Sequence, residues 1–326
     1  MEATGEHIYE LMKQPWWEEL IATYLFLGGL GGMILCLAFY FWLRGKPAKL
    51  VITQGVTGII AVIFGILALI LDLGRPERFY LVLISPNLNT SSWIFIGSVL
   101  LSLFVVFAIL FIAPIIADNL KSFKWLRPLT NLWHGKVALS IIGGIAFILG
   151  LGVALYTGIL IGVVYSAPFW HTPALPILFL VSAYSTALAT YCFLIYPQVG
   201  RAEDEEEKKS LLEAIHWGVL SDGLTMLFEI LVIGIYILIA SYGPPASTES
   251  VSMLLTGDLA PLFMGGVLIA GLIVPICLIF LYEIRTPHST KTMLVTMLSC
   301  LLVLIGGFLL RYTVLGAGVI QVPVLT

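Results

Sequence analysis

Long apolar runs separated by short polar connections dominate the sequence. Eight of these runs reach the ~20 residues that an α-helix needs to cross the hydrocarbon core of a bilayer. The composition agrees, because 60% of the residues are hydrophobic and 11% are charged, whereas soluble domains carry about 25% charged residues. We therefore predict an all-α integral membrane protein with eight transmembrane helices, at residues 20–43, 52–73, 92–116, 138–164, 174–197, 217–241, 260–283 and 292–313.

The predicted helices fall into two four-helix bundles. Residues 20–164 are expected to form the first bundle and residues 165–313 the second, which includes a polar cytoplasmic linker at 198–216. Residues 1–19 precede the first span, and residues 314–326 follow the last one. These two ends are predicted to be an outer N-terminal segment and an outer C-terminal tail.

The distribution of Lys and Arg predicts the orientation of the protein. Twelve of the 16 cationic residues fall in loops on the side of residues 44–51, and four fall on the opposite side. Because cytoplasmic loops carry the excess of Lys and Arg, both termini are expected outside the cytoplasm, in a cytoplasmic (inner) membrane protein with an outward active face. The sequence holds no dense basic run of the kind that binds nucleic acid.

The stretch that follows the second span combines an acidic helix end with two arginines. Asp72 lies at the end of an apolar helix, where both burial and the helix dipole disfavour a carboxylate. Gly74 and Pro76 are typical helix-stopping residues. Arg75 and Arg78 are the nearest partners for Asp72, and Arg311 at the end of the eighth span is an alternative one. This concentration of charge predicts a functional site.

Carboxylates inside the spans suggest a proton path. Asp222 and Glu229 lie seven residues apart on the sixth span, so both face the same side of the helix. Glu283 lies at the cytoplasmic end of the seventh span. Intramembrane carboxylates relay protons or form buried ion pairs, and the alternative here is a structural hydrogen bond to a neighbouring helix.

Cysteine and histidine positions argue against metal cofactors in this protein. The sequence contains no C-x-x-C pair, and each of its four cysteines is isolated in an apolar run, at Cys36, Cys192, Cys277 and Cys300. A b-type haem needs axial ligands on facing helices. The histidines instead fall in loops or at span ends, at His7, His134, His171, His216 and His288. We therefore expect neither haem nor an iron–sulfur cluster in this protein.

Tyr156 lies about two turns inside the fourth span, and its phenol requires a hydrogen-bond partner there. A quinone carbonyl would provide one. Trp16, Trp17, Tyr24 and Trp93 lie nearer the span ends, where an aromatic belt at the membrane interface is the alternative interpretation. The glycines at 28–32 lie within the first span and predict close helix packing rather than a phosphate-binding loop.

Five segments in order give this sequence a specific resemblance, over nearly its whole length. They are Asp72-Leu-Gly-Arg-Pro-Glu-Arg-Phe-Tyr80, Pro86-Asn87 with Ser91-Ser92-Trp93, Tyr156-Thr-Gly-Ile-Leu160, Pro168-Phe-Trp-His171, and Gly306-Gly307-Phe-Leu-Leu-Arg311-Tyr312. Together they resemble the NrfD family, which includes the membrane subunit of polysulfide reductase. The resemblance implies two four-helix bundles, a quinone site near the outer face, and no cofactor held permanently by the protein. It also implies an outer ferredoxin-type iron–sulfur partner, usually accompanied by a molybdopterin catalytic subunit.

Site residues are assigned from this resemblance one by one. Tyr156 matches the family tyrosine that hydrogen-bonds a quinone oxygen, and Asp72 and Arg75 match the motif that faces the iron–sulfur partner. Asp72 and nearby groups are expected to link the quinone site to water or to the interior. Tyr24 falls near the position of a quinone-binding histidine that this sequence lacks. The second hydrogen bond is therefore open among Tyr24, Glu19 and His171, with Trp17 also a quinone-binding candidate. The predicted partner interface consists of Arg75, Arg78 and Trp93.

The sequence thus predicts the quinone-binding anchor of a respiratory oxidoreductase, which exchanges electrons between a quinone pool, expected to be menaquinone, and a partner iron–sulfur subunit. The alternative is a proton-conducting module that uses Asp222 and Glu229. A purely structural anchor is a third possibility, and it predicts no quinone binding.

Overall fold

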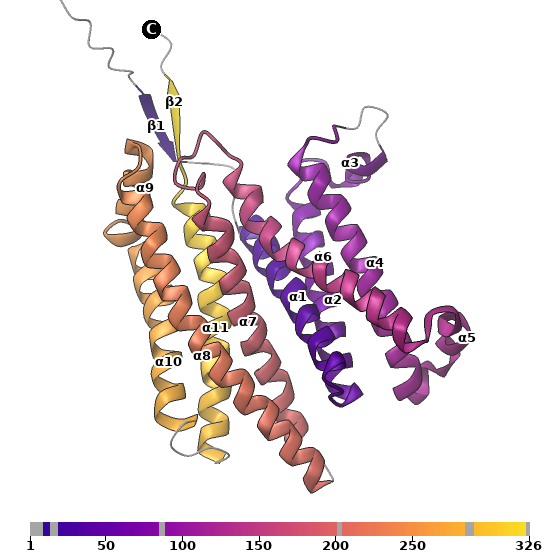
Figure 1. Ribbon diagram of the computed structural model, residues 1–326. Helices are drawn as coiled ribbons and strands as arrows, with labels where there is room; N and C mark the ends of the chain where they lie inside the picture. Colours follow the sequence, from indigo (N-terminus) through magenta and orange to yellow (C-terminus); the bar gives the residue numbers. More distant parts are fainter. Residues whose placement is uncertain (1–8, 14–18, 85–88, 201–203, 284–289, 324–326) are drawn as a thin grey trace, which may run out of the picture.

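A computed structural model describes residues 9–13, 19–84, 89–200, 204–283 and 290–323 (Figure 1). Within these ranges, eight helices are long and apolar enough to cross a membrane. This confirms the predicted all-α membrane fold, and most of the predicted span boundaries lie within a few residues of the observed ones.

The first four spanning helices pack against one another. They are α1 (Glu19–Leu43), α2 (Ala48–Leu71), α4 (Trp93–Asn119) and α6 (Lys136–Gly162). Glycines let α1 approach its neighbours closely: a Cβ atom on Gly31 would lie 2.6 Å from the carbonyl oxygen of Gly58 on α2, and one on Gly32 would lie 2.5 Å from that of Gly150 on α6. The predicted packing role of the glycines at 28–32 is therefore confirmed.

The second group consists of α7 (Ala174–Val199), α8 (Glu205–Ser241), α11 (Thr290–Gly316) and a composite seventh span. That span runs through π-helical η4 (Pro261–Ile273), α10 (Val274–Leu278) and π-helical η5 (Ile279–Glu283). It crosses α11 where a Cβ atom on Gly271 would lie 2.6 Å from the Cα atom of Gly306. Helices α1 and α6 pack against α7 and so join the two groups.

Helix α8 starts well before the predicted sixth span. The sequence places the start of that span at residue 217, whereas the helix begins at Glu205 and includes most of the expected linker. Asp204 caps it, because its side chain accepts a hydrogen bond of 3.2 Å from the backbone nitrogen of Glu206. The acidic run thus forms a solvated first turn, where negative charge complements the helix dipole.

Two short strands, one near each end of the sequence, pair with each other. Strand β1 (Tyr9–Lys13) pairs antiparallel with β2 (Val319–Pro323), with Leu11 opposite Gln321. Nothing in the sequence pattern indicated this pairing, because strands of five residues near the termini carry too little periodic signal. Both strands lie on the same side of the spans (Figure 1), which we call the terminal side.

Short helices cover the ends of the spans. On the terminal side, η1 (Pro76–Arg78) and α3 (Leu81–Ile84) lie between α2 and α4, and α9 (Pro245–Leu255) packs beside α8 and β2. On the opposite side, η2 (Lys121–Leu126), α5 (Arg127–Thr130) and η3 (Asn131–Trp133) connect α4 to α6.

Candidate functional site

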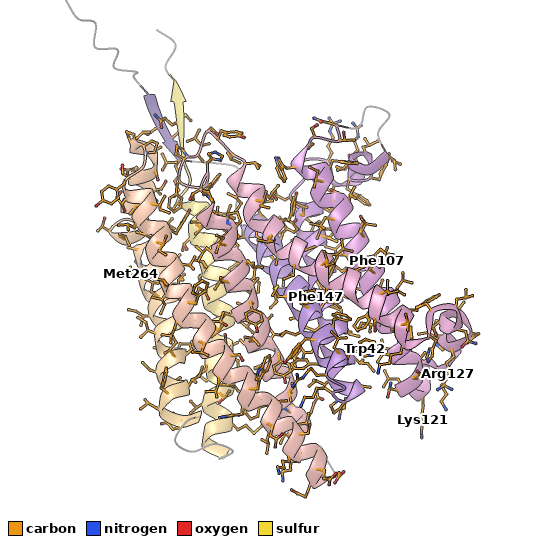
Figure 2. The ribbon with its side chains drawn as sticks, in the orientation of Figure 1. Trp42, Phe107, Lys121, Arg127, Phe147 and Met264 are labelled. Carbon is orange, nitrogen blue, oxygen red and sulfur yellow. The ribbon has the colours of Figure 1, made fainter. Side chains whose placement is uncertain are left out.

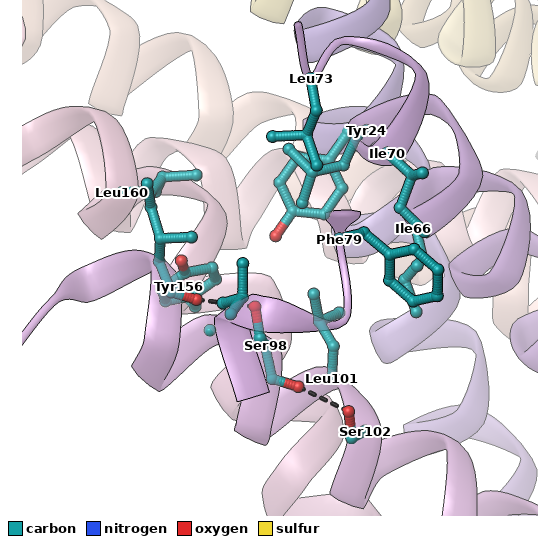
Figure 3. Close-up of a pocket in the computed structure, with 14 residues that line it drawn as sticks. Tyr24, Ile66, Ile70, Leu73, Phe79, Ser98, Leu101, Ser102, Tyr156 and Leu160 are labelled. Atoms are coloured by element: carbon teal, nitrogen blue, oxygen red, sulfur yellow. Dashed lines mark hydrogen bonds between the residues drawn. The ribbon is translucent and has the colours of Figure 1, made fainter. Parts of the chain in front are cut away.

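A cavity of about 190 Å³ lies in the first group of helices at the terminal side (Figure 3). Helices α1, α2, α4 and α6 line it, and Leu73, Phe79 and Val82 close it where the backbone leaves α2. Most of the wall is aliphatic, while polar atoms come from four hydroxyl-bearing residues, Tyr24, Ser98, Ser102 and Tyr156. Ser98 and Ser102 direct their hydroxyl hydrogens to carbonyls of their own helix, so the two tyrosines dominate the polar chemistry.

Tyr156 is held in place by α4. Its hydroxyl group donates a 2.7 Å hydrogen bond to the carbonyl oxygen of Trp93, and the side chain is only 4% exposed. Its ring lies directly against Gly97, where any Cβ atom would overlap the phenol. Trp93 and Gly97 are four residues apart and therefore face the same way on α4. Helix α4 thus holds the phenol of Tyr156 through the carbonyl group of Trp93, and Gly97 leaves room for its ring.

Tyr24 is placed differently. It is 1% exposed, and its hydroxyl group has no hydrogen-bond partner within the described part of the protein. Figure 3 shows this hydroxyl group pointing into the space that Tyr156 also lines. A buried hydroxyl without a partner is costly, so its presence on a cavity wall indicates a ligand or water that accepts its hydrogen bond.

The acidic stretch after α2 lies at the rim of this cavity. Asp72 is the partly buried residue that ends α2, and the next residue, Leu73, lines the cavity. Arg75 and Arg78 are exposed beside it. Trp93 is 41% exposed at the start of α4, and its backbone also holds Tyr156. The segment predicted to meet a partner therefore lies next to the tyrosine pair.

Two other predicted quinone ligands, Glu19 and His171, lie outside the cavity. Glu19 is exposed at the start of α1 and does not line the cavity. His171 is also outside the lining: its Nδ1 atom lies 2.6 Å from the carbonyl oxygen of Gly162, and its ring packs on Tyr165 at 4.5 Å. Trp17 lies outside the described residues. The roles of these three residues stay predictions.

A second polar cluster is buried in the other helix group. Arg311 is fully buried on α11, and its guanidinium donates to the side-chain oxygen of Ser182 at 3.0 Å and to the carbonyl oxygen of Phe179 at 3.2 Å. Phe26 and Phe179 pack against the guanidinium at 5.6 and 5.3 Å. A third hydrogen bond, of 2.6 Å, goes to the carbonyl oxygen of Gly307 on α11 itself. The described hydrogen bonds of Arg311 thus reach α7 and its own helix, and not Asp72 as the alternative pairing had it.

The two predicted intramembrane carboxylates belong to this cluster. Asp222 is 4% exposed and accepts a 2.7 Å hydrogen bond from the hydroxyl of Ser185. Glu229 is 3% exposed and lies within electrostatic reach of Arg311, while its Oε2 atom has no hydrogen-bond partner among the described residues. That carboxylate borders a void of about 10 Å³. For the third predicted member, Glu283, the side chain lies outside the described residues.

Comparisons with known proteins identify the family of this protein. The protein-family model described as "Polysulphide reductase, NrfD" matches residues 8–323 of this sequence. The chain belongs to the NrfD family. It is 31% identical to the C subunit of the polysulfide reductase of Wolinella succinogenes over 312 residues, which cover 93% of this sequence and 94% of that protein. It is 26% identical to the protein NrfD homolog of Haemophilus influenzae over 319 residues, which cover 94% and 95% of the two sequences.

Membership of the NrfD family implies a membrane subunit of a redox complex. It confirms the resemblance seen in the ordered sequence segments. The structure adds residues that the sequence pattern did not reveal. Gly97 could have been found from its four-residue spacing after Trp93, whereas Ser182 and Ser185 carried no signal, because serines are common in membrane helices as packing residues.

Proposed function

We propose that the cavity between Tyr24 and Tyr156 binds the ring of a quinone, expected to be menaquinone. The observation that carries this proposal is the buried hydroxyl group of Tyr24, which has no hydrogen-bond partner among the described residues and lies on an apolar cavity that Tyr156 also lines. Apolar pockets with a few convergent polar groups are the usual form of small-molecule sites. A quinone matches this lining, since its ring is apolar and its carbonyl oxygens accept hydrogen bonds.

The size of the cavity is compatible with one ring. An apolar protein cavity of about 150 Å³ holds benzene, and this cavity measures about 190 Å³. An isoprenoid tail would leave between Ile94 and the residues after α2, where the wall is apolar. The bound quinone would supply the two-electron chemistry, and the protein would supply the binding site, its orientation and protons.

The phenols of Tyr24 and Tyr156 would have different hydrogen-bonding roles. The O–H group of Tyr24 donates to no residue that the structure describes, and it would donate to a carbonyl oxygen of the ring. Tyr156 already donates to Trp93, so its oxygen would accept a hydrogen bond from the reduced, hydroxyl form of the ring. Asp72, partly exposed at the rim, would pass protons between this region and water. The pair thus offers one donor and one acceptor, which suits a ligand that alternates between carbonyl and hydroxyl forms.

We also propose that the terminal side faces outward from a cytoplasmic (inner) membrane and docks the electron-carrying partner. The sequence places few Lys and Arg residues on this side, as expected for the non-cytoplasmic face. A ferredoxin-type iron–sulfur subunit would contact Arg75, Arg78 and Trp93 beside the cavity, and a molybdopterin subunit would complete the complex. Electrons would then travel only a short path between the cavity and the partner.

Replacement of Tyr156 by Phe tests the quinone site. We expect the assembled complex to accumulate normally, because the ring still fills its place, but quinol-dependent turnover to fall sharply. The matched control is Tyr165→Phe, since Tyr165 is 78% exposed and lies outside the cavity. Normal turnover in the Tyr156→Phe complex would remove Tyr156 from the site.

A second function has its own supporting observation. The Oε2 atom of Glu229 has no hydrogen-bond partner in the described part of the protein, and its carboxylate borders a void the size of one water molecule, as a proton-relay carboxylate would. We propose that Asp222 and Glu229 carry protons through the second helix group during turnover. In liposomes, Glu229→Gln should abolish proton translocation while turnover continues. Unchanged translocation and turnover would make Glu229 a structural residue.

A further inference from the structure

A second large cavity, of about 470 Å³, lies at the opposite end of the first helix group. It is bounded by the end of α1, the start of α2, the end of α4 and the start of α6. Its inner wall is apolar, and its rim carries Lys46, His134 and Lys136. Figure 2 shows Trp42, which lines this cavity, at the same end of the molecule as Lys121 and Arg127. Span ends lie where lipid headgroups lie, so the rim is at headgroup depth.

The rim has a surplus of positive charge. Asp118 is the carboxylate that lines the cavity, and it is already paired: its Oδ1 atom lies 3.2 Å from Arg127, and its Oδ2 atom lies 2.8 Å from Nε2 of His134. In the part of the protein that the structure describes, neither Lys46 nor Lys136 takes part in an ion pair. Two ammonium groups at the cavity are therefore left without a counter-charge from the described residues.

The backbone fixes these two lysines and adds to the positive field. Lys46 follows Gly45, whose φ of +63° turns the backbone sharply, and the backbone nitrogen of Lys46 donates 3.0 Å to the carbonyl oxygen of Phe41. Lys136 is the first residue of α6, and α2 starts two residues after Lys46. Neither helix start has a side-chain cap, so unpaired N–H groups add partial positive charge beside both lysines.

The apolar wall specifies the type of anion. Leu43, Val51 and Leu139 line the cavity beneath the lysines, and Trp42 forms one side, stacked on Phe39 at 6.0 Å. A free inorganic ion gains nothing from such a wall, whereas the glycerol and upper acyl carbons of a lipid would bury it. Basic pockets between membrane helices bind anionic lipid headgroups. We propose that this cavity binds an anionic phospholipid, whose phosphate lies between Lys46 and Lys136.

The test uses the purified full-length protein and native mass spectrometry with defined lipids. Phosphatidylglycerol should be retained as one tightly bound molecule, in preference to phosphatidylcholine. The double variant Lys46→Ser/Lys136→Ser should bind phosphatidylglycerol roughly thirtyfold more weakly. The matched control, Lys121→Ser/Lys124→Ser, removes two exposed lysines of the same side that do not line the cavity and should leave retention unchanged.

Two further measurements, on an arginine variant and on competition by inorganic phosphate, complete the test. Lys46→Arg/Lys136→Arg should retain the lipid, which shows that loss in the serine variant follows charge and not misfolding. Inorganic phosphate at millimolar concentration should not displace the lipid. Equal retention by the serine variant and the unmodified protein, equal retention of phosphatidylcholine, or displacement by inorganic phosphate would each overturn the proposal.

Discussion

The two helix groups bury polar side chains in opposite ways. In the first group, Tyr24 and Tyr156 are neutral phenols on an apolar cavity of about 190 Å³. In the second group, Asp222, Glu229 and Arg311 are ionisable groups packed around a void of about 10 Å³. One group thus leaves space for a ring and keeps charge away from it, whereas the other fills its space and concentrates charge.

This difference suggests that the two helix groups have different functions. A neutral, roomy site suits an apolar redox ligand, because a buried charge would carry a desolvation cost that a ring cannot offset. A tightly packed charged cluster suits proton transfer or structural pairing, since it admits at most water. Helix α1 contributes to both sites, since its Tyr24 lines the cavity and its Phe26 contacts Arg311.

The largest expected effect comes from removing the buried cation. Arg311→Met would leave Glu229 without its charge partner and would remove the hydrogen bond to Ser182, so we expect a loss of about 3–5 kcal/mol of unfolding free energy. Thermal unfolding in detergent, together with the amount of protein in membranes, measures this loss. Arg127→Met is the control, since Arg127 forms an exposed pair and should cost less than about 1 kcal/mol.

A double variant sharpens the interpretation of that result. Glu229→Gln combined with Arg311→Met removes both charges, and stability should recover in part because Glu229 is no longer left as a buried charge without its partner. If the double variant is as unstable as Arg311→Met alone, the two side chains are not coupled, and the second group is not held by a charged cluster.

An intermediate effect is expected from filling the space beside Tyr156. Gly97→Ala puts a methyl group where the phenol ring lies, so the ring must shift. A misplacement of about 1 Å can cost about 100-fold in turnover, and we expect a loss of that order in quinol-dependent activity. Gly234→Ala is the matched control, because no atom lies within 4 Å of the new methyl group there. Equal activity of the two variants would contradict the placement of Tyr156.

The smallest effect concerns a single hydrogen bond in the second group. Ser185→Ala removes the donor to Asp222, and interhelical hydrogen bonds of this kind contribute about 1 kcal/mol in membranes. The variant should therefore unfold at a slightly lower temperature. Ser241→Ala provides the comparison, because the hydroxyl of Ser241 donates only to a carbonyl of its own helix. Identical unfolding of both variants would show that Ser185 does not hold Asp222.

The sequence predicted the spans well because a run of about 20 apolar residues has few other structures available to it. It also singled out Tyr156, Asp222 and Glu229, since polar groups at membrane depth stand out against an apolar background. It missed the β1–β2 pair, the start of α8 at Glu205 and the short helix α9, because local propensity and charge decide these features and hydrophobicity does not.

Spatial relations between helices were the least predictable part. The sequence placed Arg311 at the end of its span, with Asp72 as one possible partner. In the structure α11 continues to Gly316, and Arg311 contacts α7. Likewise, the hydrogen bond from Tyr156 to Trp93 joins residues 63 positions apart in sequence. Such contacts depend on how helices pack, which span prediction does not specify.

Equilibrium binding of a radiolabelled short-tailed naphthoquinone to the purified protein would decide whether the tyrosine cavity is a quinone site. One saturable site is predicted. Tyr24→Phe should weaken binding by up to about tenfold through loss of one hydrogen bond, and Gly97→Ala should weaken it further. Tyr165→Phe should bind as the unmodified protein does. Unchanged affinity in both cavity variants, or the absence of saturable binding, would contradict a quinone site between Tyr24 and Tyr156.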